Sequence, residues 1–320
     1  MSIAQPLPVP VPSAPSPGRI ARLIRFAWIL LVYNVAVVLW GAVVRATGSG
    51  AGCGDHWPLC NGVLVQFHPR AATIIELSHR MTSGITVIGV LALVVWTYLA
   101  TAKGHLARVA AVAAAVLTFN EALLGALLVL LRLTADNRSA ARGVYLSLHL
   151  ANTLLLLAAL ALTAHFLARR SAFQRGRLHF SHLPLALVGL GATLAVGVSG
   201  SLAALGDTLF PATSLRAALS QDLSRQGDWL LQLRLLHPLS ALLAGLFLVW
   251  LVMRTVIWDN SQTGNRRLGI LVLLFLLLQF GLGTADVLLL APLGMQIAHL
   301  LGADLLWIAL VLLAARVCIQ

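Results

Sequence analysis

The chain has 320 residues, of which 59% are hydrophobic and 10% are charged, so too little polar sequence remains to cover the surface of a soluble globular protein. The composition therefore predicts an integral membrane protein. The net charge of +12 does not indicate a nucleic-acid-binding protein, because the arginines lie mainly in short loops between apolar runs and form no basic face.

Residues 1–23 begin with a proline-rich stretch that cannot pack, and we predict a disordered cytoplasmic tail there. The stretch is not typical of a signal peptide, since it lacks a basic start followed by an apolar core. Eight apolar runs follow, each long enough to cross a hydrocarbon core of about 30 Å. The runs cover residues 26–44, 72–102, 109–131, 143–168, 183–205, 229–253, 268–290 and 293–315.

These runs predict an all-α integral membrane protein with eight transmembrane helices. Lys and Arg are more frequent in the loops on the side of the N-terminus, which places both termini in the cytoplasm of a protein of the cell (inner) membrane. The loop after the first run then faces outward. Its Cys53 and Cys60 indicate a disulfide on the oxidising side, with two unpaired thiols as the alternative, whereas Cys318 is expected to be an inert thiol.

The second apolar run starts with the segment Glu76-Leu77-Ser78-His79-Arg80, and charge inside apolar sequence is costly. Residues at i and i+3 lie side by side on a helix. We therefore expect Glu76 and His79 to point at one object, with Arg80 turned aside. A metal-bound cofactor is one such object.

The two halves of the chain carry matching residues at fixed spacing. They predict two repeated four-helix bundles, residues 24–168 and 183–320, joined by a cytoplasmic linker at 169–182. At shifts of 158 and 150 residues the matches are His79 with His237, Gly125 with Gly283, Glu121 with Gln279, and His149 with His299.

Four histidines fall at similar depth, near the outer ends of four different runs. A single buried histidine is explained equally well by a hydrogen bond to a neighbouring helix. Four at equivalent places in a repeat indicate haem iron ligands instead, with His79 paired to His149 and His237 paired to His299. Zn²⁺ is disfavoured, because it more often takes Cys or further ligands. Surface or loop positions are expected for His56, His68, His105, His165, His179 and His182.

The two halves differ beside these histidines, because the position of Glu76 corresponds to Arg234. The carboxylate could take a proton next to a haem edge, whereas the guanidinium is suited to bind haem propionates. Propionate contacts and plain loop solvation are equally open for Arg132, Arg138 and Arg142. Interhelical hydrogen bonds are the first explanation for Asn34, Asn120, Glu121, Asn152, Gln279, Asp286 and Asp304, with proton paths as an alternative for Glu121 and Asp304.

From about residue 24 to residue 316 the chain resembles the haem A synthases of bacteria and mitochondria. The likeness is carried by Gly41 to Gly50 running into the loop from Cys53 to Gly62, by Glu76, His79 and Arg80, and by His149-Leu150, His237 and His299. The resemblance implies oxidation of the ring methyl group of haem O to the formyl group of haem A, through a hydroxymethyl intermediate, for the haem A supply of cytochrome oxidase.

The resemblance also implies roles for individual residues. His79 and His149 would flank the substrate haem O with Glu76 as the catalytic residue, His237 and His299 would ligate a haem b cofactor, and Cys53 and Cys60 would match a redox-active or structural cysteine pair. A haem O synthase is the implied supplier of substrate, and the electron acceptor is unknown.

Two features depart from the family pattern. Residues 206–228 contain no second cysteine pair, and Pro238 follows His237 where an arginine is commoner, which predicts a kink at this ligand. The alternative functions are a di-haem cytochrome that passes electrons to a quinone and a haem carrier without turnover. Glu76 argues against the cytochrome, because a pure electron carrier needs no acid beside one ligand.

Overall fold

The computed structural model describes residues 17–63, 68–169, 182–224, 228–257 and 263–318, and it forms no β-strand among them. Eight of the described helices are long and apolar enough to cross a membrane, which confirms the predicted fold class and spans. These helices are α1 (Pro17–Ala46), α2 (Ala71–Ala100), α3 (Leu106–Leu130), α4 (Ala140–Ala168), α5 (Leu183–Leu209), α7 (Trp229–Val252), α8 (Thr263–Leu288) and α9 (Leu293–Cys318).

Helix α1 begins earlier than the sequence predicts. It starts at Pro17, so residues 17–23 belong to a helix and not to a disordered tail. The physical reason is burial, because Leu23 and Ala27 are fully buried in the core between the helices. Residues 1–16 of the predicted tail and residues 170–181 of the predicted linker, with His179, lie outside the described residues.

Three short helices complete the described chain: the 3₁₀ turn η1 (Ser49–Ala51), α6 (Leu215–Asp222) and the π-helical turn η2 (Met253–Ile257). The sequence analysis did not predict α6, which packs against α7. Its N-cap is Ser214, whose hydroxyl accepts a hydrogen bond from the Ala217 N–H at 3.2 Å. A serine at an N-cap is the local signal that indicates such a helix start.

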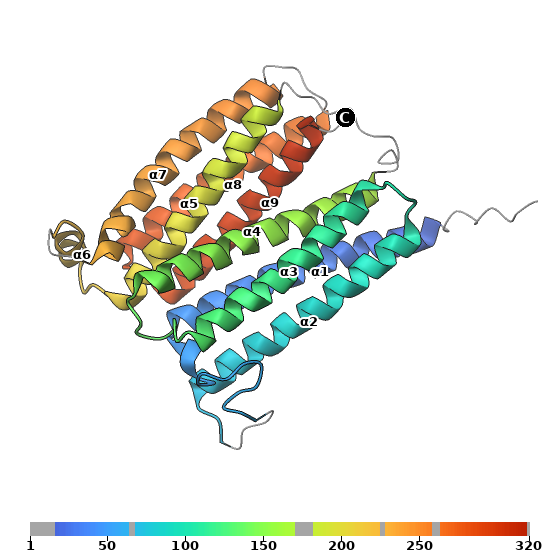
Figure 1. Ribbon diagram of the computed structural model, residues 1–320. Coiled ribbons are helices and arrows are strands. Elements are labelled where there is room, and N and C mark those ends of the chain that lie inside the picture. The colour runs from blue at the N-terminus through green and yellow to red at the C-terminus, as the bar shows by residue number, and fades with distance from the viewer. Residues whose placement is uncertain (1–16, 64–67, 170–181, 225–227, 258–262, 319–320) are drawn as a thin grey trace, which may run out of the picture.

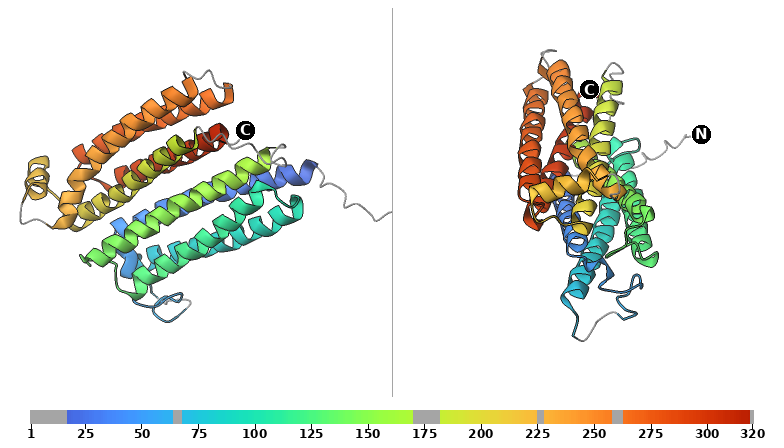
Figure 2. Two further views of the ribbon diagram at one scale, coloured as in Figure 1. Left: turned by 45° about the horizontal axis from the view of Figure 1, so that its top comes forward. Right: turned by 90° about the vertical axis from the view of Figure 1, so that its left-hand side faces the viewer.

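The long helices pack in two groups that lie side by side (Figures 1 and 2). In the first group, α1 to α4 each contact the next and α4 returns to α1; the second group contains α5, α7, α8 and α9. Helices α4 and α1 of the first group contact α5 and α9 of the second. The repeat relation between the two groups stays a prediction.

Both ends of the described chain lie at the same end of the bundle (Figure 1). The opposite end carries α6 and the loop between α1 and α2. A disulfide joins Cys53 to Cys60 in this loop, which confirms the predicted bond, and we call this the disulfide end. Cys318 is a buried free cysteine.

The apolar core of the first group extends into the second through Trp307 of α9. The indole N–H of Trp307 donates to the Leu154 carbonyl of α4 at 2.6 Å. Many other leucines and valines face outward, as expected of helices that contact lipid. Pro238 lies inside α7, and the helix continues from Trp229 to Val252 without a break.

Candidate functional site

Each of the four predicted ligand histidines lies within the first three turns of a helix that begins at the disulfide end. Each ring lies beside a glycine of the long helix that precedes it in the chain. A Cβ added to Gly200 would lie 2.9 Å from Cε1 of His237, and one added to Gly283 would lie 3.0 Å from Cε1 of His299. A side chain at either glycine would therefore displace the imidazole ring. The pairs are Gly41–His79, Gly125–His149, Gly200–His237 and Gly283–His299.

The second histidine pair has a geometry that suits a shared metal ion. The ring centroids of His237 and His299 are 6.5 Å apart, with an angle of 82° between the ring planes. Two imidazoles bonded to one metal ion from opposite sides, each at about 2 Å, have centroids about 6 Å apart. His237 Nδ1 lies 3.0 Å from the Ser199 hydroxyl, which can fix the ring, and His299 Nδ1 is buried without a hydrogen-bond partner.

The first histidine pair comes from α2 and α4. His79 and His149 are close enough to interact electrostatically. The Nδ1 atoms of both are buried without a hydrogen bond, and His149 Nδ1 lies 3.3 Å from Glu121 Oε1. The described residues hold no cluster of three or more His, Cys, Asp or Glu that would suit a metal ion without a porphyrin. Two imidazoles per site therefore fit haem iron better than zinc.

Glu76 is 3% exposed, and both of its oxygens have partners. Oε2 accepts a hydrogen bond from the Cys53 N–H at 2.8 Å, and Oε1 pairs with Arg80 Nη2 at 2.5 Å. The expectation that Arg80 turns aside is therefore wrong. Residues at i and i+4 are neighbours on a helix just as those at i and i+3 are, and here the opposite charges pair.

The Glu76–Arg80 pair holds the disulfide loop against α2. Arg80 Nη1 donates to the carbonyl oxygens of His56 at 2.7 Å and Leu59 at 2.9 Å. Since Arg80 follows His79 directly, the loop is attached beside the first histidine pair. A second ion pair, from Arg132 to Asp55 at 2.7 Å, joins the loop to the connection between α3 and α4.

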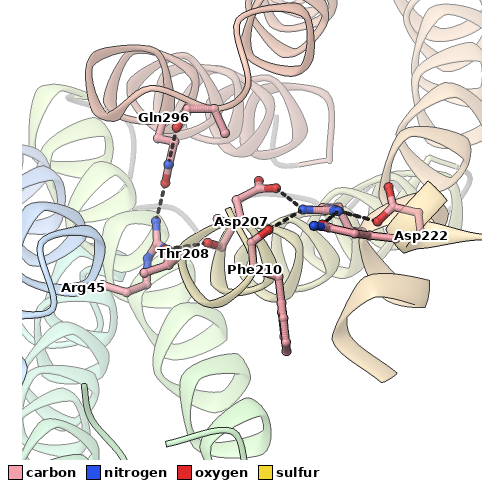
Figure 3. A network of polar contacts seen from close by, with 10 residues as sticks. Arg45, Asp207, Thr208, Phe210, Asp222 and Gln296 are labelled. Atoms are coloured by element: carbon pink, nitrogen blue, oxygen red, sulfur yellow. Dashed lines mark hydrogen bonds and ion pairs between the residues drawn. The ribbon is translucent and has the colours of Figure 1, made fainter. Parts of the chain in front are cut away.

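Arg234, the counterpart of Glu76, is occupied by protein carboxylates. Its guanidinium pairs with Asp222 at 2.5 Å and with Asp207 at 3.1 Å, and both aspartates are labelled in Figure 3. Propionate binding by Arg234 stays a prediction, and the two carboxylates would compete with a propionate for its guanidinium. Asp222 belongs to α6, the helix that the sequence did not predict.

Arg45 is a site residue that the sequence analysis missed. Although it belongs to α1, its Nη1 donates to the Ala204 carbonyl at 2.7 Å and the Thr208 hydroxyl at 2.8 Å, and its Nη2 donates to Gln296 Oε1 at 2.9 Å (Figure 3). Its partners lie on α5 and α9, so Arg45 links the two helix groups close to both histidine pairs. An arginine directly after the first apolar run was the available signal.

Replacing Arg45 by methionine is expected to destabilise the contact between the two groups. A single hydrogen bond to a charged group contributes about 1.5–3 kcal/mol and Arg45 makes three, so we expect the free energy of unfolding to fall by at least the value of one such bond. Thermal unfolding of the purified protein in detergent measures the change. Arg70→Met, at an exposed position before α2, is the matched control, and equal melting temperatures of the two variants would contradict the proposed link.

The three arginines proposed as propionate partners all have contacts within the protein. Arg132 pairs with Asp55, Arg138 stacks over the Phe210 ring at 4.8 Å, and Arg142 donates to the Ala135 and Asn137 carbonyls at 2.5 and 2.8 Å. Arg142 is 3% exposed and its Nε has no partner. A propionate contact stays a prediction for these arginines.

The histidines outside the two pairs vary in their surroundings. His105 is buried, contrary to the surface prediction: its Nδ1 caps α3 by accepting from the Ala107 N–H, and burial, with the nearby Arg108, lowers its pKa. His165 is also buried, within α4. His56, His68 and His182 lie in or beside loops, as predicted.

The polar residues inside the spans only partly form the predicted interhelical hydrogen bonds. Asn120 and Glu121 bond to Asn152 on the neighbouring helix, whereas Asn34 donates to the Leu30 carbonyl of its own helix at 2.8 Å. Buried side-chain oxygens without a hydrogen-bond partner occur in Gln279, Asp286 and Asp304.

Comparison with known proteins identifies a family for this chain. Residues 24–311 match the family model COX15-CtaA, described as cytochrome oxidase assembly protein. A "Protoheme IX farnesyltransferase" of Thermus thermophilus is 45% identical over 296 residues, which cover 92% of this chain and 48% of that protein. This chain therefore spans about half the length of the curated relatives that it matches over most of its own length.

Shorter matches occur with proteins named "Heme A synthase". The one from Exiguobacterium sp. is 34% identical over 105 residues, or 33% of this chain and 35% of that protein. The one from Geobacillus kaustophilus is 44% identical over 90 residues, or 28% of each. Since the family model covers most of the chain, the protein belongs to the COX15-CtaA family of multi-pass membrane proteins, the haem A synthase family.

Proposed function

We propose that this protein oxidises the ring methyl group of haem O to the formyl group of haem A through a hydroxymethyl intermediate. The observation that carries the proposal is the unequal surroundings of two similar histidine pairs. Beside His79 lie a carboxylate and a disulfide loop, whereas the equivalent arginine near His237 is neutralised by two aspartates. One site therefore suits chemistry on its haem, and the other suits a haem that stays unchanged.

His237 and His299 would hold a haem b cofactor. Their centroid separation of 6.5 Å and the unpartnered Nδ1 of His299 support this assignment. Bound haem b would supply one-electron redox chemistry. The protein supplies the orientation of the rings, through the Ser199 hydroxyl and through the space left open at Gly200 and Gly283.

Replacing Gly283 by valine is expected to remove the haem b while leaving both imidazoles in the chain. Its Cβ would stand 3.0 Å from His299 Cε1, so the ring would have to move. Gly281→Val is the matched control, since a Cβ there meets nothing within 4 Å and the loss of a helical glycine is the same. Haem per chain in the purified variants measures the effect; equal loss in both would contradict the steric explanation.

His79 and His149 would flank the substrate haem O, with Glu76 beside them. Glu76 is bound by the Cys53 N–H and by Arg80, so its charge lies between the disulfide loop and the first histidine pair. We propose that it holds the loop over the site and positions charge near the reacting edge of the substrate. The Cys53–Cys60 disulfide keeps the Cys53 N–H in reach of the carboxylate.

The protein is proposed to lie in the cell membrane with both termini in the cytoplasm and the disulfide end outside. Disulfides persist in oxidising compartments, and the basic loops lie at the opposite end, as the positive-inside rule requires. The electron acceptor is not identified by these features.

A haem O synthase is the proposed supplier of the substrate. The Thermus thermophilus relatives are named for farnesyl transfer to protohaem, and this chain covers only 48% of each. We infer that the remainder of those proteins performs the farnesyl transfer and that the matching part forms haem A. A farnesylated haem is strongly apolar, so transfer within the membrane from one protein to the next avoids exposing it to water.

Chromatography of the haems extracted from the purified protein, produced together with a haem O synthase, tests the proposal. Haem b together with haem O, haem A or the hydroxylated intermediate is the expected result. Haem b alone, at two per chain, would instead support the di-haem cytochrome. Haem O without any oxidised product would support a carrier.

A further inference from the structure

A polar cluster between α3 and α4 surrounds the carboxylate of Glu121. Oε2 accepts a hydrogen bond from the Asn152 amide at 2.5 Å, and Oε1 accepts one from the Thr153 hydroxyl. Asn152 is itself held by the Leu117 carbonyl, to which it donates at 2.8 Å, and by Asn120, which donates to its oxygen at 2.7 Å. The carboxylate is therefore fixed in one position by side chains that have few alternative partners in an apolar span.

The same carboxylate lies directly behind His149. Its Oε1 is 3.3 Å from His149 Nδ1, and that nitrogen is buried with no other hydrogen-bond partner. Glu121 lies one turn before Gly125, the glycine beside the His149 ring. A small rotation of the imidazole would therefore complete a hydrogen bond from Nδ1–H to the carboxylate and leave Nε2 free to bind a ligand.

The second helix group has an amide at the equivalent place. Gln279 lies one turn before Gly283, which contacts the His299 ring. The Gln279 Oε1 atom is directed at Gly302, and it and His299 Nδ1 each lack a hydrogen-bond partner. The first group thus has a charged acceptor behind one histidine, and the second group has a neutral group that is turned away.

A hydrogen bond from a ligand histidine to a carboxylate fixes the ring tautomer and makes the other nitrogen a stronger donor to the metal. A stronger donor, with a negative charge behind it, stabilises ferric iron relative to ferrous iron. Replacing such a partner typically changes metal affinity or activity by about 10–100-fold.

We propose that Glu121 is a positioning residue that orients His149 and lowers the reduction potential of haem iron bound between His79 and His149, relative to the iron between His237 and His299. This inference rests on the proposed function, because it takes His149 as an iron ligand. Glu121 acts through His149 and makes no contact with the reacting carbon. The exchange of Glu121 for Gln279 would then contribute to a difference in potential between the two sites.

The test is a spectroelectrochemical titration of the purified full-length chain after addition of ferric protohaem to two equivalents. Glu121→Gln keeps the size of the side chain but removes the charge and replaces one acceptor oxygen with a donor NH2 group. We expect the ratio of the affinities of the first site for ferric and ferrous haem to fall about tenfold. This change raises the reduction potential of the first site by about 59 mV for a one-electron couple. The potential of the second site should not change.

Gln279→Ala is the matched control, and it should leave the first-site potential unchanged. Thr153→Val removes one hydrogen bond to Glu121 and should raise the same potential by a smaller amount. The inference would be overturned by an unchanged first-site potential in Glu121→Gln or by an equal rise of that potential in Gln279→Ala. It would also be overturned if the wild-type chain took up only one equivalent of protohaem.

Failure of the proposed function is distinguishable from failure of this inference. If the extracted haems contain no oxidised product but Glu121→Gln still shifts the first-site potential, the proposed function fails and the role of Glu121 stands. If haem A is formed and the potential does not move, the role of Glu121 fails and the proposed function stands.

Discussion

Replacing His299 by alanine should abolish the low-spin haem b spectrum that the proposed function predicts for the purified protein, and His237→Ala should do the same. His237 and His299 would together hold a low-spin haem, because their ring separation of 6.5 Å would allow both imidazoles to bind one iron. Loss of either ring leaves the iron with a single protein ligand. The reduced-minus-oxidised optical spectrum, together with haem per chain, measures the effect.

Two other histidines serve as controls for this prediction. His79→Ala should alter the first site and leave the haem b spectrum in place, because it lies on α2 in the other helix group. His182→Ala, at the end of α5 away from the disulfide end, should change neither site. A spectrum that survives in His299→Ala would overturn the assignment of the second pair.

The spans were predictable because hydrophobic length alone determines which segments can cross a membrane. The start of α1 was not predictable, because Pro17 and the basic residues after it suggest a tail. The helix extends to Pro17 because Leu23 is buried against other helices. Helix α6 is short and polar, so hydropathy carried no signal for it. The signal for this helix in the sequence is the N-cap residue Ser214.

At the histidine pairs, residue type and spacing were sufficient to predict which residues matter, but not their partners. His79 at i+3 and Arg80 at i+4 are both close enough to interact with Glu76. Arg80 forms the ion pair, and its position is also fixed by the loop carbonyls to which it donates. The ion pairs of Arg234 were not predicted, because its partners Asp207 and Asp222 lie on two other helices. Spacing within one helix cannot reveal contacts of that kind.

Arg45 shows how close the two candidate sites lie to each other. It is one turn after Gly41, which contacts the His79 ring, and its partner Gln296 precedes His299 by less than one turn on α9. Its other partner, Ala204, is one turn after Gly200, which contacts His237. One side chain thus joins α1, which packs beside His79, to α5, which packs beside His237, and to α9, which carries His299.

Replacing Glu76 by glutamine is expected to stop haem A formation while the protein retains haem b. The amide cannot form the ion pair with Arg80, and no negative charge remains where the disulfide loop meets α2. Removing one preorganised electrostatic contact costs about 10²–10³-fold in rate, so haem A should fall by about 100-fold or more. Extracted haem A and the haem b spectrum are measured on the same preparation.

Arg80→Met separates the carboxylate from its ion pair. This variant loses the contacts to the loop carbonyls of His56 and Leu59 but keeps Glu76 and the Cys53 N–H beside it. If the carboxylate itself serves the chemistry, Arg80→Met should retain more haem A formation than Glu76→Gln. Equal losses would mean that Glu76 acts only by holding the disulfide loop, and undiminished haem A in Glu76→Gln would remove this residue from the mechanism.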